Sequence, residues 1–528
     1  MPVPLAVRGL MLDAARLVES PRYYRRFLQF ASDWGANAVV LRLADDQGCA
    51  VRFRSHPELV THVNAMRPDE VQDLARAARS RKIELIPEIE SFGHSRYITA
   101  SPDHFELADR DPSGESWRNG LAPLHPQAMK LFEDLYEETC GLVRGRYLHG
   151  GCDEVAWGAH SHSRELLKTR TREQVWGEYL SALNSIARRL GREFIVWADH
   201  ALRHEPRILE HLDRSVILLD WDYAELDPAS VERMARRGLS CGFRVIGGPG
   251  LIWCRWGCRP GMGALRNVDA FVEAYRGLDD EKALGVVVTN WLPGRYLQNG
   301  IWDCMAYAAT AMAHGAKAAR NSAFRNFARR HLGAKWDDDF ADLFHSLYAY
   351  VENRTSCSPQ WMRPAQPQVW ADEAGLRAVL EDGRIAGPPF GRLARLARRL
   401  VRRVKRNRED FKALSLSVAY LEHIYWRAAA VCAARSDGLS GRRLRSLAEE
   451  INMRDRAMLE ALISDWDRGR TRKLWRGMAE AFGPEDRLVS RMAEAAAYST
   501  ELSLRPEKFE EIIFSSGNGS SVLKTGEG

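Results

Sequence analysis

The sequence of 528 residues contains no stretch of about 20 apolar residues, the length that a membrane-spanning helix needs. Its first residues, Met1–Arg8, also lack the apolar run after a basic start that is typical of a secretory signal peptide. The 76 Lys and Arg residues nearly balance the 70 Asp and Glu residues, and the net charge is only +6. We therefore expect neither a membrane nor a nucleic acid as a partner.

The cysteines do not form a framework of disulfides. There are nine, an odd number, and they are scattered along the chain. Cys254 and Cys258 are close in sequence, but no second cysteine pair or histidine pair accompanies them, as a zinc site would require. We expect reduced thiols and a cytoplasmic protein.

The residues that are present predict a repeat of strand and helix. With 45% hydrophobic and 28% charged residues, the chain has the composition of a globular protein with a sizeable core. Eight short runs are β-rich, most of them almost continuously apolar, and each is followed by a helical segment. These runs are Val7–Asp13, Ala38–Leu43, Ile83–Glu90, Arg146–Asp153, Phe194–Asp199, Val216–Asp222, Phe243–Gly248 and Leu284–Trp291.

Eight such units predict an α/β fold, a (β/α)₈ TIM barrel over residues 1–335. The structural alternative is an open, doubly wound sheet, which usually has a glycine-rich phosphate loop after an early strand. No such loop follows Val7–Asp13. Polar or aromatic residues also stand at the ends of seven of the runs, which in a barrel would meet in one pocket.

A helical C-terminal region follows the barrel. Residues 336–391, rich in proline and glycine from Thr355 onward, are predicted to be a connecting segment. Residues 392–514 have helical periodicity, and the small polar residues 515–528 are expected to be a disordered tail. The first helix, Arg392–Arg408, is basic and amphipathic. A helix packed on its neighbour with a solvated basic face is the favoured interpretation, and a membrane or nucleic-acid surface is the alternative.

Asp153 and Glu154, at the end of the fourth run, are the candidate catalytic residues. Glycoside hydrolysis needs one protonated carboxyl group to donate to the leaving oxygen and a second negative centre to stabilise positive charge near the anomeric carbon. Adjacent acids elsewhere are usually a surface pair or a helix cap. Their place at a predicted strand end, after Gly150 and Gly151, favours the catalytic interpretation.

Several motifs occur in an order that resembles glycoside hydrolase family 20, the β-N-acetylhexosaminidases, and most closely its hexosaminidase D-like branch. They are Arg8–Arg16, Asn37–Asp46, Pro87–His94, the pair Asp153 and Glu154 preceded by Cys152, and Thr289–Trp291 followed by Arg295 and Tyr296. The resemblance covers the barrel from Arg8 to about Ala318. It implies that Arg16 holds the sugar's 3- and 4-hydroxyls, that Asp45 supports the active-site histidine, and that this histidine is His94.

The resemblance also implies a substrate and a mechanism. Trp197, Trp221 and Trp291 match three tryptophans that wall the pocket for a 2-acetamido group; barrel core is the alternative interpretation of these residues. The substrate would be a carbohydrate with a terminal N-acetylglucosamine or N-acetylgalactosamine, hydrolysed with retention. Asp153 would orient the acetamido group as the nucleophile, Glu154 would be the general acid and base, and no metal or organic cofactor would be needed.

The chain departs from the family pattern at three places. Glu90, a predicted substrate-binding residue, stands where many members have aspartate, and Pro293 stands where they have glutamate. The run Gly248–Cys254 contains no tyrosine, although the family commonly has one there to bind the acetamido oxygen. Two other functions therefore stay open: a glycosidase of different specificity on the same barrel, and a catalytically silent carbohydrate-binding protein.

Overall fold

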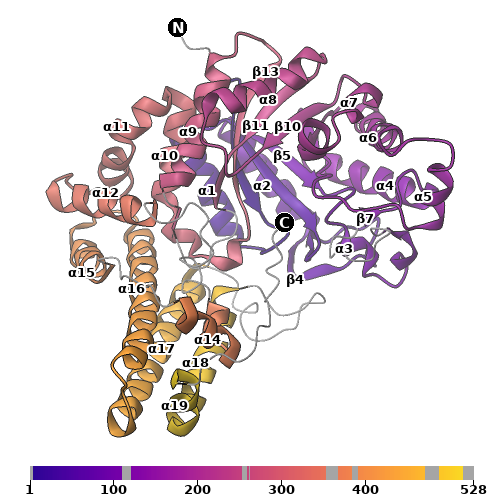
Figure 1. Ribbon diagram of the computed structural model, residues 1–528. Coiled ribbons are helices and arrows are strands. Elements are labelled where there is room, and N and C mark those ends of the chain that lie inside the picture. The colour runs from indigo at the N-terminus through magenta and orange to yellow at the C-terminus, as the bar shows by residue number, and fades with distance from the viewer. Residues whose placement is uncertain are drawn as a thin grey trace.

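The computed structural model of the protein describes residues 4–109, 120–252, 259–260, 262–352, 367–382, 390–469 and 487–514. Eight parallel strands form a closed barrel, because β1 pairs with β2 on one side and with β13 on the other (Figure 1). The barrel strands are β1 (Val7–Asp13), β2 (Ala38–Asp45), β5 (Glu84–Ile89), β8 (Tyr147–His149), β9 (Glu193–Trp197), β10 (Ile217–Trp221), β11 (Arg244–Gly248) and β13 (Ala283–Asn290). The predicted barrel is confirmed, and each strand falls within or next to its predicted run.

Helices surround the barrel, as the alternation of strand and helix predicts. They are α1 (Pro21–Asp33), α2 (Pro68–Ser80), α4 (Pro126–Leu142), α6 (Arg172–Arg189), α7 (Ile208–His211), α8 (Pro228–Ser240), α9 (Met262–Gly277) and α10 (Trp302–His314). The segment after β9 is the exception, because no long helix follows this strand. A π-helical turn, His200–His204, and the four residues of α7 replace it there.

The barrel interior is a packed apolar cluster that ends in aromatic side chains. Its members are Val7, Met11, Ala38, Val40, Ile86, Tyr147, Ile195, Trp197, Ile217, Leu219, Ile246, Leu284, Val287 and Trp291. Trp197 and Trp291 are the last residue of β9 and the residue after β13, and Trp221 and Tyr223 pack against them. Trp197 and Trp291 therefore lie where the apolar core of the barrel meets its carboxyl-terminal face.

Two excursions extend this face. After β2 the chain forms β3 (Gly48–Val51), which pairs antiparallel with β2, and β4 (Thr61–Met66), which pairs with β3. After β5 it forms the short helix α3 (Arg96–Thr99), and β6 (Ala108–Asp109) pairs with β7 (Gly120–Leu121). The barrel part also contains β12 (Gly250–Ile252), α5 (Ser161–Leu166) and α11 (Ala316–Asn326).

The C-terminal region is helical and has a second apolar core. Its helices are α14 (Glu373–Asp382), α15 (Phe390–Leu400), α16 (Arg408–Ser436), α17 (Gly441–Gly469), α18 (Leu488–Leu504) and α19 (Pro506–Phe514). The core also includes Leu17 and Leu297 of the barrel, so the region packs against it. The predicted connecting segment contains α12 (Asp338–Glu352) as well as α14. Residues 353–366, 383–389 and the predicted tail 515–528 lie outside the described residues, as do Cys254 and Cys258.

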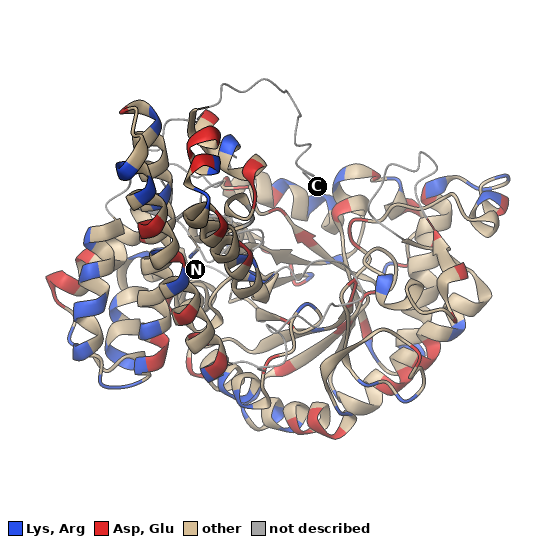
Figure 2. Cartoon of the chain, turned by 90° about the horizontal axis from the view of Figure 1, so that it is seen from below, with Lys and Arg blue, Asp and Glu red and all other residues tan. Residues whose placement is uncertain are grey.

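The predicted basic helix is shorter than expected. It ends at Leu400, a 3₁₀ turn follows, and Asn407 adopts a left-handed φ of 47°, which an α-helix cannot accommodate. Its apolar residues are buried, and Arg392 and Arg399 form ion pairs with Asp342 and Asp339 of α12. Figure 2 shows both basic and acidic residues on the helices of this region.

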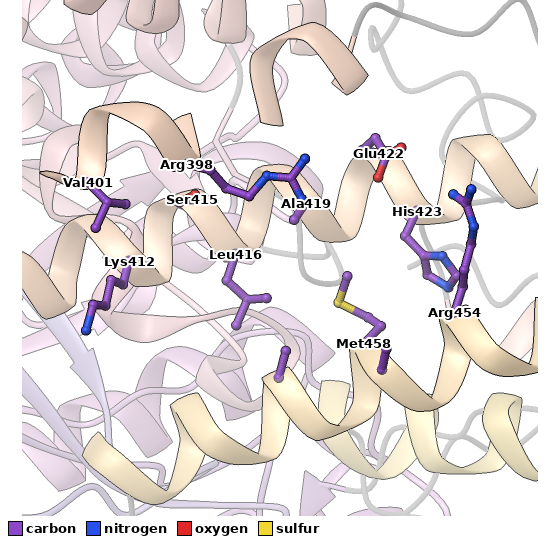
Figure 3. A pocket seen from close by; sticks show the side chains of 12 residues that line it. Arg398, Val401, Lys412, Ser415, Leu416, Ala419, Glu422, His423, Arg454 and Met458 are labelled. Atoms are coloured by element: carbon purple, nitrogen blue, oxygen red, sulfur yellow. The ribbon is translucent and has the colours of Figure 1, made fainter. Parts of the chain in front are cut away.

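A groove of about 580 Å³ lies between α15, α16 and α17, lined by apolar and basic side chains (Figure 3). Among the described residues, no helix combines the length and the apolar character needed to cross a bilayer.

Candidate active site

The turn after β8 carries the predicted catalytic pair in an unusual backbone conformation. Gly151, Cys152 and Glu154 have φ values of 68°, 76° and 49°. The left-handed region is costly for residues with a side chain, about 1–3 kcal/mol each, and such residues concentrate at functional sites. The tight turn lets two neighbouring carboxylates reach one place, which an extended strand does not allow because its side chains alternate.

The Glu90 carboxylate is one group that holds this turn. Its Oε1 accepts hydrogen bonds from the backbone N–H groups of Ser91, Phe92 and Gly93 at 3.1 Å each, and of Cys152 at 2.7 Å. Glu90 is fully buried. The sequence predicts a substrate-binding role for Glu90, and in the structure its Oε1 links the loop after β5 to the turn after β8.

Two further side chains fix the turn. Burial and the Arg42 guanidinium lower the pKa of His149 to about 3, so this imidazole is neutral and its Nδ1 accepts the N–H of Gly151 at 2.9 Å. The Asp199 carboxylate accepts the backbone N–H of Glu154 at 3.2 Å. The positions of both catalytic candidates therefore depend on buried polar groups of three different strand ends.

His94 joins the two carboxylates. Its Nε2 lies 3.3 Å from Glu154 Oε2 and 3.9 Å from Asp153 Oδ2, and its Nδ1 lies 2.8 Å from Asp46 Oδ2. Burial lowers the pKa of His94, but the carboxylates of Asp153 and Asp46 outweigh it and hold the pKa well above its usual value. The imidazole is therefore cationic at neutral pH.

The carboxylate that supports His94 is Asp46, whereas the sequence motif assigned this role to Asp45. Because the two residues are adjacent at the end of β2, their side chains point in different directions. Asp45 Oδ2 lies 3.1 Å from Arg16 and 2.7 Å from Arg42 Nε. Burial raises the pKa of Asp45, but the two guanidinium groups outweigh it and lower this pKa to about 2.

Arg42 is a site residue that sequence reasoning missed. Its guanidinium is fully buried, forms ion pairs with Asp45, Glu88 and Glu90, and lies 4.0 Å from Asp153 Oδ1. The sequence contains one signal for this role: Arg42 is the single charged residue in the apolar run Ala38–Leu43. A charge in a buried strand requires charged or polar partners nearby.

Aromatic side chains enclose the space beside these groups. The rings of Trp197 and Trp291 are 5.5 Å apart, and the guanidinium of Arg16 lies 5.0 Å from the centre of the Trp291 ring. Trp221 stacks on Tyr223 at 5.0 Å, and Trp291 Nε1 donates to the Tyr223 hydroxyl at 2.6 Å. The three predicted tryptophans thus form one aromatic cluster with Tyr223, which sequence reasoning did not select, and Trp197 and Trp291 also belong to the buried core of the barrel.

Several buried polar atoms beside this aromatic cluster have no hydrogen-bond partner among the described residues. Asp153 Oδ1, Trp221 Nε1 and both amide atoms of Asn290 are buried without a hydrogen-bond partner within the described part of the chain. Buried polar groups are normally paired, so such atoms in a site indicate a polar ligand. Asp45, Asp46 and His94 have metal-ligand side chains within 4.8 Å, but Arg16 and Arg42 beside them repel a cation.

The site has the parts required for acid–base chemistry on a sugar. Two carboxylates meet at a cationic histidine, a guanidinium fork is available for hydroxyl groups, and indole rings offer the flat apolar surfaces on which sugar rings pack.

Comparison with known proteins supports this assignment. Residues 6–246 match the family model described as glycosyl hydrolase family 20, catalytic domain. The chain is 24% identical over 276 residues to the β-hexosaminidase of Vibrio furnissii, which covers 46% of this chain and 43% of that protein. It is 23% identical over 274 residues to hexosaminidase D of Bos taurus, covering 49% of this chain and 76% of that protein.

A solved structure, the family 20 exo-β-N-acetylglucosaminidase of Vibrio harveyi, is 22% identical with a TM-score of 0.45, and covers 60% of this chain and 55% of its own. The chain thus spans about half the length of several of these relatives. The matched residues contain β1 to β10, the first residues of β11 and every motif at the first four strand ends. The first part of the barrel, residues 6–246, is therefore similar to the catalytic domain of glycosyl hydrolase family 20.

Proposed function

We propose that the protein is a β-N-acetylhexosaminidase, which removes terminal N-acetylglucosamine or N-acetylgalactosamine from a carbohydrate by a retaining, substrate-assisted mechanism. The observation that carries the proposal is the position of His94 Nε2, 3.3 Å from Glu154 and 3.9 Å from Asp153. At this position His94 contacts two carboxylates that have different neighbours, as two different catalytic roles require.

In the proposed first step Glu154 donates its proton to the glycosidic oxygen as the bond to the anomeric carbon breaks. The carbonyl oxygen of the substrate's acetamido group attacks the anomeric carbon from the other side. Asp153 accepts a hydrogen bond from the acetamido N–H and stabilises the positive charge of the cyclic oxazolinium.

In the second step the Glu154 carboxylate takes a proton from water, whose oxygen attacks the anomeric carbon and reopens the ring. Each of the two steps inverts the configuration of the anomeric carbon, so the configuration is retained overall. His94, held by Asp46, donates to Glu154 and so keeps this carboxyl group in place through both steps.

Tyr223 supplies the hydroxyl group that the run Gly248–Cys254 lacks. It stacks on Trp221 and accepts a hydrogen bond from Trp291, so its ring and hydroxyl are part of the acetamido pocket. Burial raises the pKa of Tyr223, so the hydroxyl stays protonated. In this proposal a tyrosine after β10 replaces the one that other members have after the next strand.

A panel of aryl glycosides tests the proposal. We expect turnover of aryl N-acetyl-β-glucosaminide or galactosaminide and little turnover of the plain β-glucoside, which has no acetamido group. Preferential cleavage of the plain glucoside would indicate another glycosidase. Binding of N-acetylglucosamine without turnover of any aryl glycoside would indicate a carbohydrate-binding protein.

A further inference from the structure

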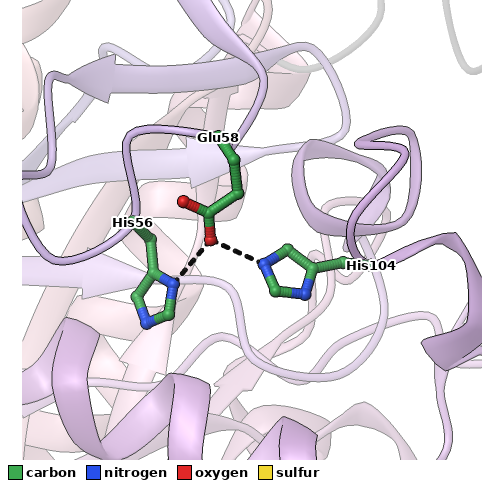
Figure 4. Close-up of side chains that lie close together, drawn as sticks. All are labelled: His56, Glu58 and His104. Carbon is green, nitrogen blue, oxygen red and sulfur yellow. Dashed lines mark hydrogen bonds and ion pairs between the residues drawn. The ribbon is translucent and has the colours of Figure 1, made fainter.

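Two histidines and a glutamate meet between the two excursions that extend the carboxyl-terminal face, apart from the residues of the active site. His56 and Glu58 lie in the loop between β3 and β4, and His104 lies after α3. Figure 4 shows both imidazoles directed at one carboxylate oxygen: His56 Nδ1 and His104 Nε2 are each 2.7 Å from Glu58 Oε1. The three side chains come from two segments that are separate in sequence.

The donor set is one that zinc prefers. Imidazole nitrogen and carboxylate oxygen bind Zn²⁺ at about 2.0–2.2 Å, and two histidines with one glutamate are a sufficient set of protein ligands when water takes the fourth position. One ligand atom of each residue lies within 4.8 Å of the others. A tetrahedral ion would separate nitrogen and oxygen by roughly 3.3 Å, so each imidazole would move by only about 0.6 Å.

A carboxylate lies near the nitrogen of His56 that does not face Glu58, as is usual around metal-binding histidines. A histidine that binds a metal with one nitrogen usually donates from the other to a carboxylate. His56 Nε2 makes no hydrogen bond to a described residue, but it lies 3.5 Å from Asp134 Oδ2 of α4, a carboxylate to which it can donate after a small shift. The side chains are 14%, 25% and 18% exposed, which leaves room for an ion to enter.

We propose that His56, Glu58 and His104 bind a zinc ion that fastens the β3–β4 loop to the segment after α3. Both segments continue into the active site. Val60 N donates to Tyr97 O at 3.0 Å, and Arg96 N donates to Asp46 Oδ1 at 3.1 Å. The ion would thereby stabilise the backbone around Asp46 without contact with substrate.

Calorimetric titration of zinc chloride into the chelator-treated full-length chain tests the site. We expect one ion per chain with micromolar or tighter affinity, and a higher melting temperature with zinc. Glu58→Gln keeps an oxygen that can accept both imidazole hydrogen bonds but removes the anionic ligand, so we expect at least tenfold weaker binding. Asp134→Asn leaves all three ligands and should weaken binding by about 10–100-fold, the usual cost of losing such a partner.

His314→Ala is the matched control, because it removes an exposed histidine at the end of α10 and should leave zinc binding unchanged. Equal zinc affinity of the wild type and Glu58→Gln would overturn the proposal, as would the absence of binding at micromolar zinc. Either result would identify the cluster as a hydrogen-bonded clamp only. The readout is binding rather than activity, so it is independent of the proposed glycosidase function.

Discussion

Replacement of Asp46 by asparagine tests the unit formed by Asp46, His94 and Glu154. The amide keeps the size of the side chain but removes the negative charge 2.8 Å from His94 Nδ1. A hydrogen bond to a charged group is worth about 1.5–3 kcal/mol. If His94 needs its charge to hold Glu154 in the transition state, this loss corresponds to a roughly 10–150-fold lower kcat. KM should change little, because Asp46 acts through His94.

The pH profile gives an independent readout of the same variant. In the wild type the pKa of His94 is raised by Asp153 and Asp46, so the imidazolium form persists as pH rises above neutrality. Asp46→Asn removes one of these two carboxylates and lowers the pKa of His94. Activity of the variant should therefore decline at lower pH on the alkaline side than activity of the wild type, measured with an aryl N-acetylglucosaminide.

Asp45→Asn is the matched variant, because Asp45 is adjacent in sequence but pairs with Arg16 and Arg42. It should mainly raise KM and leave the alkaline limb in place. The reasoning is refuted if Asp46→Asn keeps kcat within threefold of wild type while Asp45→Asn shifts the alkaline limb. That result would restore the assignment made from the sequence motif.

Three other substitutions test single roles. Glu154→Gln cannot donate a proton and should lower activity by about 10²–10⁴-fold on a substrate with a poor leaving group, with a smaller loss on a good one; activity within tenfold on the poor leaving group would exclude Glu154 as the acid. Arg16→Lys should be nearly as harmful as Arg16→Ala in kcat/KM, because an ammonium group cannot copy the planar fork; wild-type kinetics in both variants would show that Arg16 does not bind the sugar. Tyr223→Phe should lower kcat/KM by about 10-fold or more for N-acetyl substrates, since one hydrogen bond to the acetamido oxygen is lost; an unchanged value would place the acetamide contact elsewhere.

The barrel was predictable because its signal is repeated. Strands such as Ala38–Asp45 are buried on both faces, and their apolar runs reflect that burial directly. The structure differs from the prediction where contacts between distant segments determine the local conformation. The short α7 after β9 has no signal in composition, and the predicted basic helix ends at Leu400, well before the left-handed Asn407, whose side chain donates to His331 O.

The site was predictable as a collection of residues, but not as a network. Strand-end position pointed to His94 and to the catalytic pair, whereas the choice between Asp45 and Asp46 depends on side-chain direction at the end of β2, which one sequence does not specify. Arg42 and Tyr223 were missed because each resembled a structural residue within its own segment. Only the packing of neighbouring strand ends brings them to Asp153 and Trp291.

The response of the rate to fluorine on the substrate's acetyl group tests the central claim most directly. Aryl glycosides with acetyl, mono-, di- and trifluoroacetyl groups would be compared under conditions where chemistry limits the rate. If the acetamido oxygen is the nucleophile and Asp153 orients it, kcat/KM should fall steeply with each fluorine, because each makes that oxygen a poorer nucleophile. A rate that stays flat across the four substrates would contradict substrate assistance by the pair Asp153 and Glu154.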